Sequence, residues 1–91
     1  DAIIATHGLL VTSAMRAIES RGLRIPDDVQ IIGYMSDWVS EVTSPRVSFV
    51  KQNQKEIGTK AFKLLFDHLN GDTCVQHVIV KARLETREST K

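Results

Sequence analysis

The chain has 91 residues, a formal net charge of +1, 42% hydrophobic residues and 25% charged residues. This length is enough for one small domain, and the composition excludes a disordered chain. The scattered basic residues and the small net charge exclude a basic surface for nucleic acid, so any DNA binding must come from another segment. The single cysteine excludes an internal disulfide, and no apolar run reaches the ~18 residues of a membrane span.

The first elements are a strand and a helix. Residues 2–5 form a short apolar run, which is typical of a parallel strand covered on both faces. Because natural N-termini rarely begin inside a strand, we expect a segment of a longer protein, and no signal peptide is visible at its start. Residues 9–21 follow a helical period, and Gly22 stands where a capping glycine belongs. The stripe expected to cover a sheet consists of Leu10, Ala14, Ala17 and Ile18.

The middle of the chain adds two strands separated by an irregular stretch. A turn at Pro26 precedes an apolar strand at residues 29–34. Residues 35–45 are irregular, with one helical turn expected at 38–42. Residues 47–50 are predicted as a third strand from their β-branching and alternation.

The last part of the chain contains the clearest helix, at residues 54–70, which a stop signal at residues 70–72 ends. Its apolar stripe consists of Ile57, Ala61, Leu64, Leu65 and Leu69. Residues 75–80 and 83–86 are predicted as one or two closing strands. The resulting order β-α-β-loop-β-α-β indicates an α/β fold with a doubly wound parallel sheet.

Patterns of catalysis and metal binding are missing from the sequence. The glycines are spread singly, so there is no phosphate loop, and no serine stands in a nucleophile elbow. Cys74 and His77 form a C-x-x-H pair with His68 nearby, but structural zinc needs four ligands. We therefore predict no catalytic residue, no metal and no cofactor, and an enzyme of flavodoxin-like topology lacks any supporting residue.

Two strand-end loops provide the candidate ligand site. Ligands of open parallel sheets bind at the carboxyl ends of the strands. His7 follows the first predicted strand, and Met35, Asp37 and Trp38 follow the second. A tryptophan ring beside a carboxylate suits a sugar, which stacks on the ring and donates a hydrogen bond to the acid. The alternative is that Trp38 only covers the end of the sheet.

The first helix also carries a candidate dimer interface. Its predicted sheet-facing stripe leaves Val11 and Met15 as additional apolar residues. We expect these two side chains to be buried between two copies of the chain. The alternative is that another part of the same protein covers them.

Several segments resemble the LacI/GalR family of transcriptional regulators, in the family's order and over essentially the whole chain. One example is RGLRIPDDV at residues 21–29, and another is RESTK at the end of the chain. The matching segments are residues 1–6, 14–18, 21–29, 31–34, 44–52, 57–65 and 85–90. The terminal segment favours this branch over sugar-binding proteins of transporters, which share the fold and are the alternative.

The resemblance implies a fragment of a type I periplasmic-binding-protein-like domain, namely the C-terminal part of the effector-binding domain. Residues 1–50 would belong to the C-terminal lobe, residues 51–80 to a crossover with a helix and strand of the N-terminal lobe, and residues 81–91 to a return strand. The implied protein is a cytoplasmic homodimer that senses a small, sugar-like effector. Its helix-turn-helix would lie upstream, so DNA would be bound only by that absent domain.

This sequence departs from the family at the usual effector contacts. The family's Asn-Asp after the first strand is replaced by His7 and Gly8, and its Asp-Asp after the second strand by Met35 and Ser36. Asp37 is the nearest carboxylate that can substitute. We therefore expect a carbohydrate-like effector that is contacted differently.

Overall fold

The structure is a computed structural model that describes residues 1–91. The chain forms two compact units. The first unit contains Asp1–Gln52 and Arg83–Lys91, and the second contains Asn53–Ala82. The chain thus leaves the first unit once and returns to it once.

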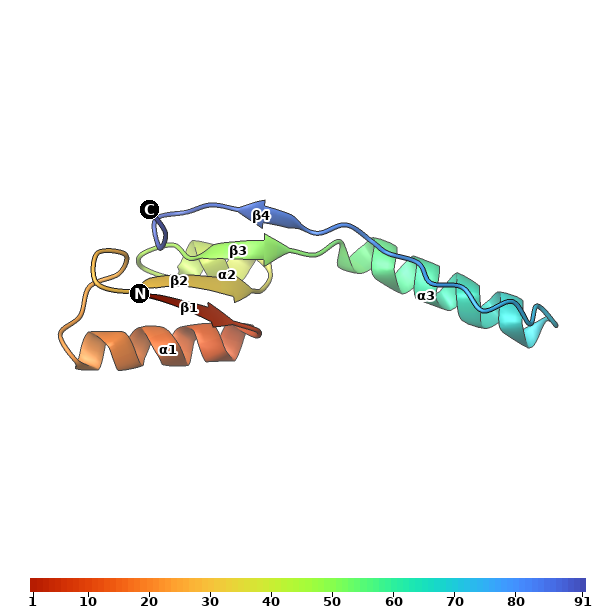
Figure 1. Cartoon of the computed structure of the whole chain (residues 1–91), viewed down its shortest axis with the longest axis horizontal. Helices are drawn as coiled ribbons and strands as arrows, with labels where there is room; N and C mark the ends of the chain where they lie inside the picture. The colour runs from red at the N-terminus through yellow and green to blue at the C-terminus, as the bar shows by residue number, and fades with distance from the viewer. The chain divides into compact units, whose positions relative to one another are not determined.

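The first unit is built on a four-stranded sheet in the order β1-β2-β3-β4 (Figure 1). The strands are β1 (Ala2–Ala5), β2 (Gln30–Tyr34), β3 (Ser48–Lys51) and β4 (Arg83–Glu85). The first three run parallel, and β4 pairs antiparallel with β3. The predicted α/β fold class is confirmed, and the antiparallel β4 is the strand that returns from the second unit.

Helix α1 (Gly8–Ser20) covers β1 and β2 with a face that differs in part from the predicted one. The buried stripe is Val11, Met15 and Ile18, of which Val11 and Met15 pack with Ile31 and Val47. Of the predicted stripe, Ile18 is buried and Ala14 packs against the core, whereas Leu10 is 54% exposed and Ala17 is also exposed, so these two positions were wrong.

The position of Val11 and Met15 therefore needs correction. Both side chains lie in the core of their own chain, with exposed fractions of 0% and 8%. They were expected between two copies because Leu10, Ala14, Ala17 and Ile18 seemed sufficient to cover the sheet. The large apolar side chains that α1 leaves exposed are Leu9 and Leu10.

The ends of α1 follow the sequence signals. The Nδ1 atom of His7, the N-cap residue, accepts a hydrogen bond from Leu9 N at 3.3 Å. Gly22 follows the last turn with φ of +69°, the left-handed conformation that glycine adopts without strain. The predicted capping role of Gly22 is confirmed.

Helix α2 (Asp37–Val42) is short and is held against β3. Ser40 is completely buried, and its Oγ donates to Val47 O at 2.7 Å. This bond fixes the predicted single helical turn beside the sheet.

The C-terminal residues 86–91 form hydrogen bonds with both β2 and β3 near the point where these two strands begin to pair. Ser89 is completely buried, donates from Oγ to Ile31 O at 2.6 Å and accepts from Ser48 N at 2.8 Å. Its backbone adds hydrogen bonds from Ser89 N to Arg46 O and from Ile31 N to Ser89 O. The tail thus supplies ladder contacts that the two strands do not make with each other.

The second unit consists of helix α3 (Gln54–Leu69) and the segment that follows it. Asn53 caps the helix by accepting from Glu56 N at 3.1 Å, and Gly71 follows its end with φ of +98°. No residue of α3 is buried, so its apolar stripe is largely exposed. Phe62 and Phe66 stack with ring centroids 5.9 Å apart.

One predicted strand is absent. Residues 75–80 form no strand, although the run Val78–Val80 is apolar and β-branched. A strand needs a partner for its backbone groups, and this unit contains no other strand beside it. The closing strand is β4 alone. No helix of the chain has the length and apolarity that crossing a membrane requires.

Candidate functional site

The strand register brings the two predicted loops to one edge of the sheet. Strands β1 and β2 are parallel, and Ala5 pairs with Gly33 near their carboxyl ends. His7 and Met35 each follow two residues after this pair, so both loops leave the sheet at the same edge. His7 is exposed and Met35 is half-buried.

Contacts around Gly8 draw α1, Met35 and α2 together. A Cβ built on Gly8 would lie 3.9 Å from Met35 Cβ and 3.8 Å from Val39 Cγ2. Met35 also packs on the strand, because its Sδ lies 3.3 Å from a Cβ built on Gly33. Gly8, the residue next to His7, therefore lies beside both Met35 and Val39 of α2.

Trp38 is exposed at the start of α2. It is the only tryptophan in the chain, and 68% of its surface is accessible. The ring is therefore not buried against the end of the sheet by residues of this chain, and it follows Asp37 directly in the sequence.

Asp37 is paired with a residue that the sequence analysis did not single out. Lys51, the last residue of β3, donates from Nζ to Asp37 Oδ2. This hydrogen bond, with the charge of Lys51, lowers the pKa of Asp37 below its ordinary value, and the more distant charge of Arg87 adds to the effect. Its position in the sequence could have indicated Lys51 as a site residue, because Lys51 ends a parallel strand at the same edge of the sheet as Met35.

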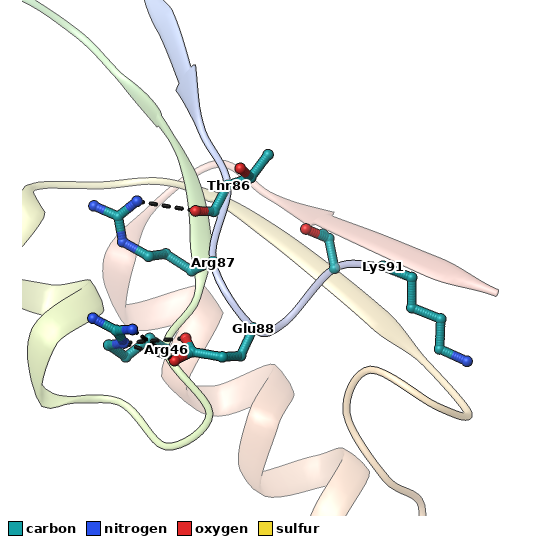
Figure 2. A pocket seen from close by; sticks show the side chains of 6 residues that line it. Arg46, Thr86, Arg87, Glu88 and Lys91 are labelled. Atoms are coloured by element: carbon teal, nitrogen blue, oxygen red, sulfur yellow. Dashed lines mark hydrogen bonds and ion pairs between the residues drawn. The ribbon is translucent and has the colours of Figure 1, made fainter.

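A separate open pocket lies at the other edge of the sheet (Figure 2). It is lined by Arg46, Thr86, Arg87, Glu88, Thr90 and Lys91. The charges there are already paired: Arg46 donates two bonds to Glu88 Oε1, at 2.9 and 2.7 Å. These contacts fasten the C-terminal tail, so we assign this pocket a structural role.

No group of three or more His, Cys, Asp or Glu side chains is arranged to hold a metal ion. Cys74 is exposed in the segment after α3. The residues of the C-x-x-H pair therefore enter no candidate metal centre.

Comparison with known proteins identifies the relatives of this chain. Residues 1–90 match the periplasmic binding protein-like domain. The lactose operon repressor of Rhizobium radiobacter is 31% identical over 91 residues, which cover 100% of this chain and 80% of that protein. The transcriptional regulator CelR of Thermobifida fusca is 31% identical over 90 residues, which cover 98% of this chain and 26% of that protein.

Solved structures give the same result. The CelR–cellobiose complex superposes with a TM-score of 0.86 at 31% identity, covering 98% of this chain and 28% of that one. The ribose operon repressor of Lactobacillus acidophilus has a TM-score of 0.86 at 34% identity, covering 100% of this chain and 34% of that one. The chain thus spans about a quarter to a third of CelR and of the ribose operon repressor, but 80% of the lactose operon repressor.

The fold and the strand-end loops define a periplasmic-binding-protein-like domain. The named relatives are transcriptional regulators and repressors, and the match extends over nearly the whole chain. The chain belongs to the LacI family of transcriptional regulators, as its sequence motifs predicted.

Proposed function

We propose that this chain is the effector-sensing segment of a cytoplasmic LacI-type transcriptional regulator and has no enzymatic role. It binds a small carbohydrate-like effector at the carboxyl edge of the sheet, through His7, Met35, Asp37 and Trp38. The regulator is a homodimer, and a helix-turn-helix in another part of the protein binds DNA.

The observation that carries this proposal is the meeting of two strand-end loops at one edge of a LacI-family sheet. Parallel α/β sheets place ligands at this edge. An exposed aromatic ring, a carboxylate and an imidazole occur there together. Such a combination of one apolar face with a few polar groups suits a sugar ring.

The relatives support a carbohydrate as the ligand. One was solved with cellobiose, another with D-xylulofuranose and a third with ribose. Since Met35 and Ser36 carry no charge, Asp37 is the carboxylate available to this loop.

We further propose that the two compact units belong to two lobes of the effector domain. The first unit would form part of one lobe, and Asn53–Ala82 would contribute to the other. The two chain crossings, at Gln52 and at Arg83, would then be connections between lobes.

Calorimetry of the natural full-length protein with cellobiose and D-ribose tests the site. We expect Trp38→Ala to weaken binding about fivefold, because aromatic contacts are worth about 1 kcal/mol beyond burial. Phe62→Ala is the matched control, since Phe62 is equally exposed at 67% but lies on α3. Equal affinities for Trp38→Ala and wild type would reject the stacking role, and no binding of either sugar would count against this ligand class.

A further inference from the structure

We propose that Lys51 is a positioning and specificity-determining residue, which forms with Asp37 a carboxylate–ammonium pair that selects ligands with two adjacent hydroxyl groups. This inference rests on the proposed function, because it concerns the same edge of the sheet. It adds a residue and a chemical requirement: a hydrogen-bond donor and an acceptor side by side on the ligand.

The two groups come from different elements. Asp37 opens α2, Lys51 ends β3, and Lys51 Nζ lies 2.5 Å from Asp37 Oδ2. Neither side chain has another ion-pair partner within 4.0 Å. The side chains are 56% and 38% exposed, so a ligand can reach both groups.

The backbone of Lys51 is fixed in the sheet, whereas the N-cap position of α2 lacks a side-chain hydrogen bond. Lys51 pairs with Arg83 in the β3–β4 ladder. The N-cap residue of α2, Ser36, makes no side-chain capping bond. Lys51 therefore anchors the Asp37 carboxylate to the sheet and fixes where it stands next to Trp38.

Stability does not account for the pair. Ion pairs between exposed side chains contribute little to folding, because water screens the charges and two long side chains lose freedom. Each group nevertheless keeps unused hydrogen-bonding capacity, since an ammonium has three donors and a carboxylate two acceptor oxygens. The pair is thus available for recognition.

Adjacent hydroxyls satisfy both groups at once. One hydroxyl donates to the Asp37 carboxylate, and its neighbour accepts from the Lys51 ammonium. Hydrogen bonds to charged groups are stronger than neutral ones. A ligand that lacks one of the hydroxyls displaces water from the pair but leaves one hydrogen-bonding position of Asp37 or Lys51 unfilled, which is how polar sites reject deoxy analogues.

A ligand-free experiment tests positioning. We would follow the Asp37 carboxyl carbon by NMR during an acid titration of the natural full-length protein. Lys51→Met should raise the pKa of Asp37 toward its ordinary value, and Lys51→Arg should keep it low. Lys55→Met, which removes an exposed lysine of α3, is the control and should change nothing. An unchanged Asp37 titration in Lys51→Met would overturn the positioning role.

A binding experiment tests specificity. Whichever of D-ribose and cellobiose binds is compared with its monodeoxy analogues by calorimetry. We expect the wild type to prefer the parent sugar about tenfold over at least one analogue, and Lys51→Met to lose that preference. Retained preference in Lys51→Met would overturn the role of Lys51 and leave the sugar site standing. Binding of neither sugar by the wild type would instead reject the proposed function, and this inference with it.

Discussion

Ser89 shows how much one small polar side chain contributes to this sheet. It lies between β2 and β3, where its hydroxyl both donates and accepts a hydrogen bond in a position closed to water. Around it, the Ser48 hydroxyl lies 2.7 Å from Thr90 Oγ1 and accepts from Arg87 N at 2.7 Å. The tail is therefore held by buried hydrogen bonds more than by apolar contacts.

We expect Ser89→Ala to lower the free energy of unfolding by about 2 kcal/mol, because Ser48 N–H and Ile31 C=O each lose a bond away from water. Urea denaturation measures this change. Ser44→Ala is the control, since Ser44 is exposed, and it should change stability by less than about 0.5 kcal/mol. Equal urea midpoints for the two variants would show that the Ser89 hydrogen bonds do not stabilise the sheet.

The candidate site was partly predictable at this scale. The rule that ligands meet the carboxyl ends of parallel strands was sufficient to place His7 and Met35 at one edge. Lys51 was missed because its contact with Asp37 joins two elements 14 residues apart, and nothing in the local pattern of either element specifies that contact. The hydrogen bond from Ser89 to Ile31 joins residues 58 positions apart and was missed for the same reason.

At the scale of elements, short-range signals located the helices and most strands. Capping residues and apolar periodicity indicated α1 and α3 to within a residue at each end. The orientation of α1 was wrong in part, because Leu10 and Val11 are both apolar and periodicity alone does not distinguish between two adjacent stripes. Gly33 explains the observed orientation of α1. Because Gly33 has no side chain, Val11 can pack directly against the backbone of β2.

Gly33 and Gly58 form a matched pair for testing this packing. A Cβ on Gly33 would come within 2.5 Å of Val11 Cγ2, which is fully buried and has no space to move into. We expect Gly33→Ala to destabilise the fold by about 1–3 kcal/mol. Gly58 lies in α3 with nothing within 4 Å of its Cβ position, so Gly58→Ala should stabilise by about 0.5–1 kcal/mol. Thermal unfolding of both variants measures the changes, and a neutral Gly33→Ala would refute the close contact with α1.

At the scale of the whole molecule, the structure requires a different set of contact residues for the proposed homodimer. Val11 and Met15 lie in the chain's own core, so charged substitutions there would unfold the protein and would not simply separate two copies. The large exposed apolar residues of α1 are Leu9 and Leu10, which are 72% and 54% accessible. These are the side chains of α1 available to a second copy.

We expect the natural full-length protein to sediment as a dimer, and Leu10→Glu to shift it toward monomer, because a buried charge opposes association. Leu69→Glu, on the exposed end of α3, is the control and should remain dimeric. A monomeric wild type would refute the homodimer. A Leu10→Glu variant that dimerises as tightly as the wild type would place the interface elsewhere.

The central claim is that a carbohydrate-like effector binds at the carboxyl edge of the sheet. A crystal structure of the natural full-length protein grown with D-ribose or cellobiose tests it most directly. We predict a sugar ring in contact with Trp38, with hydroxyls bonded to Asp37 and Lys51. A sugar bound instead in the pocket beside Arg46 and Lys91, or away from both edges of this sheet, would contradict the claim.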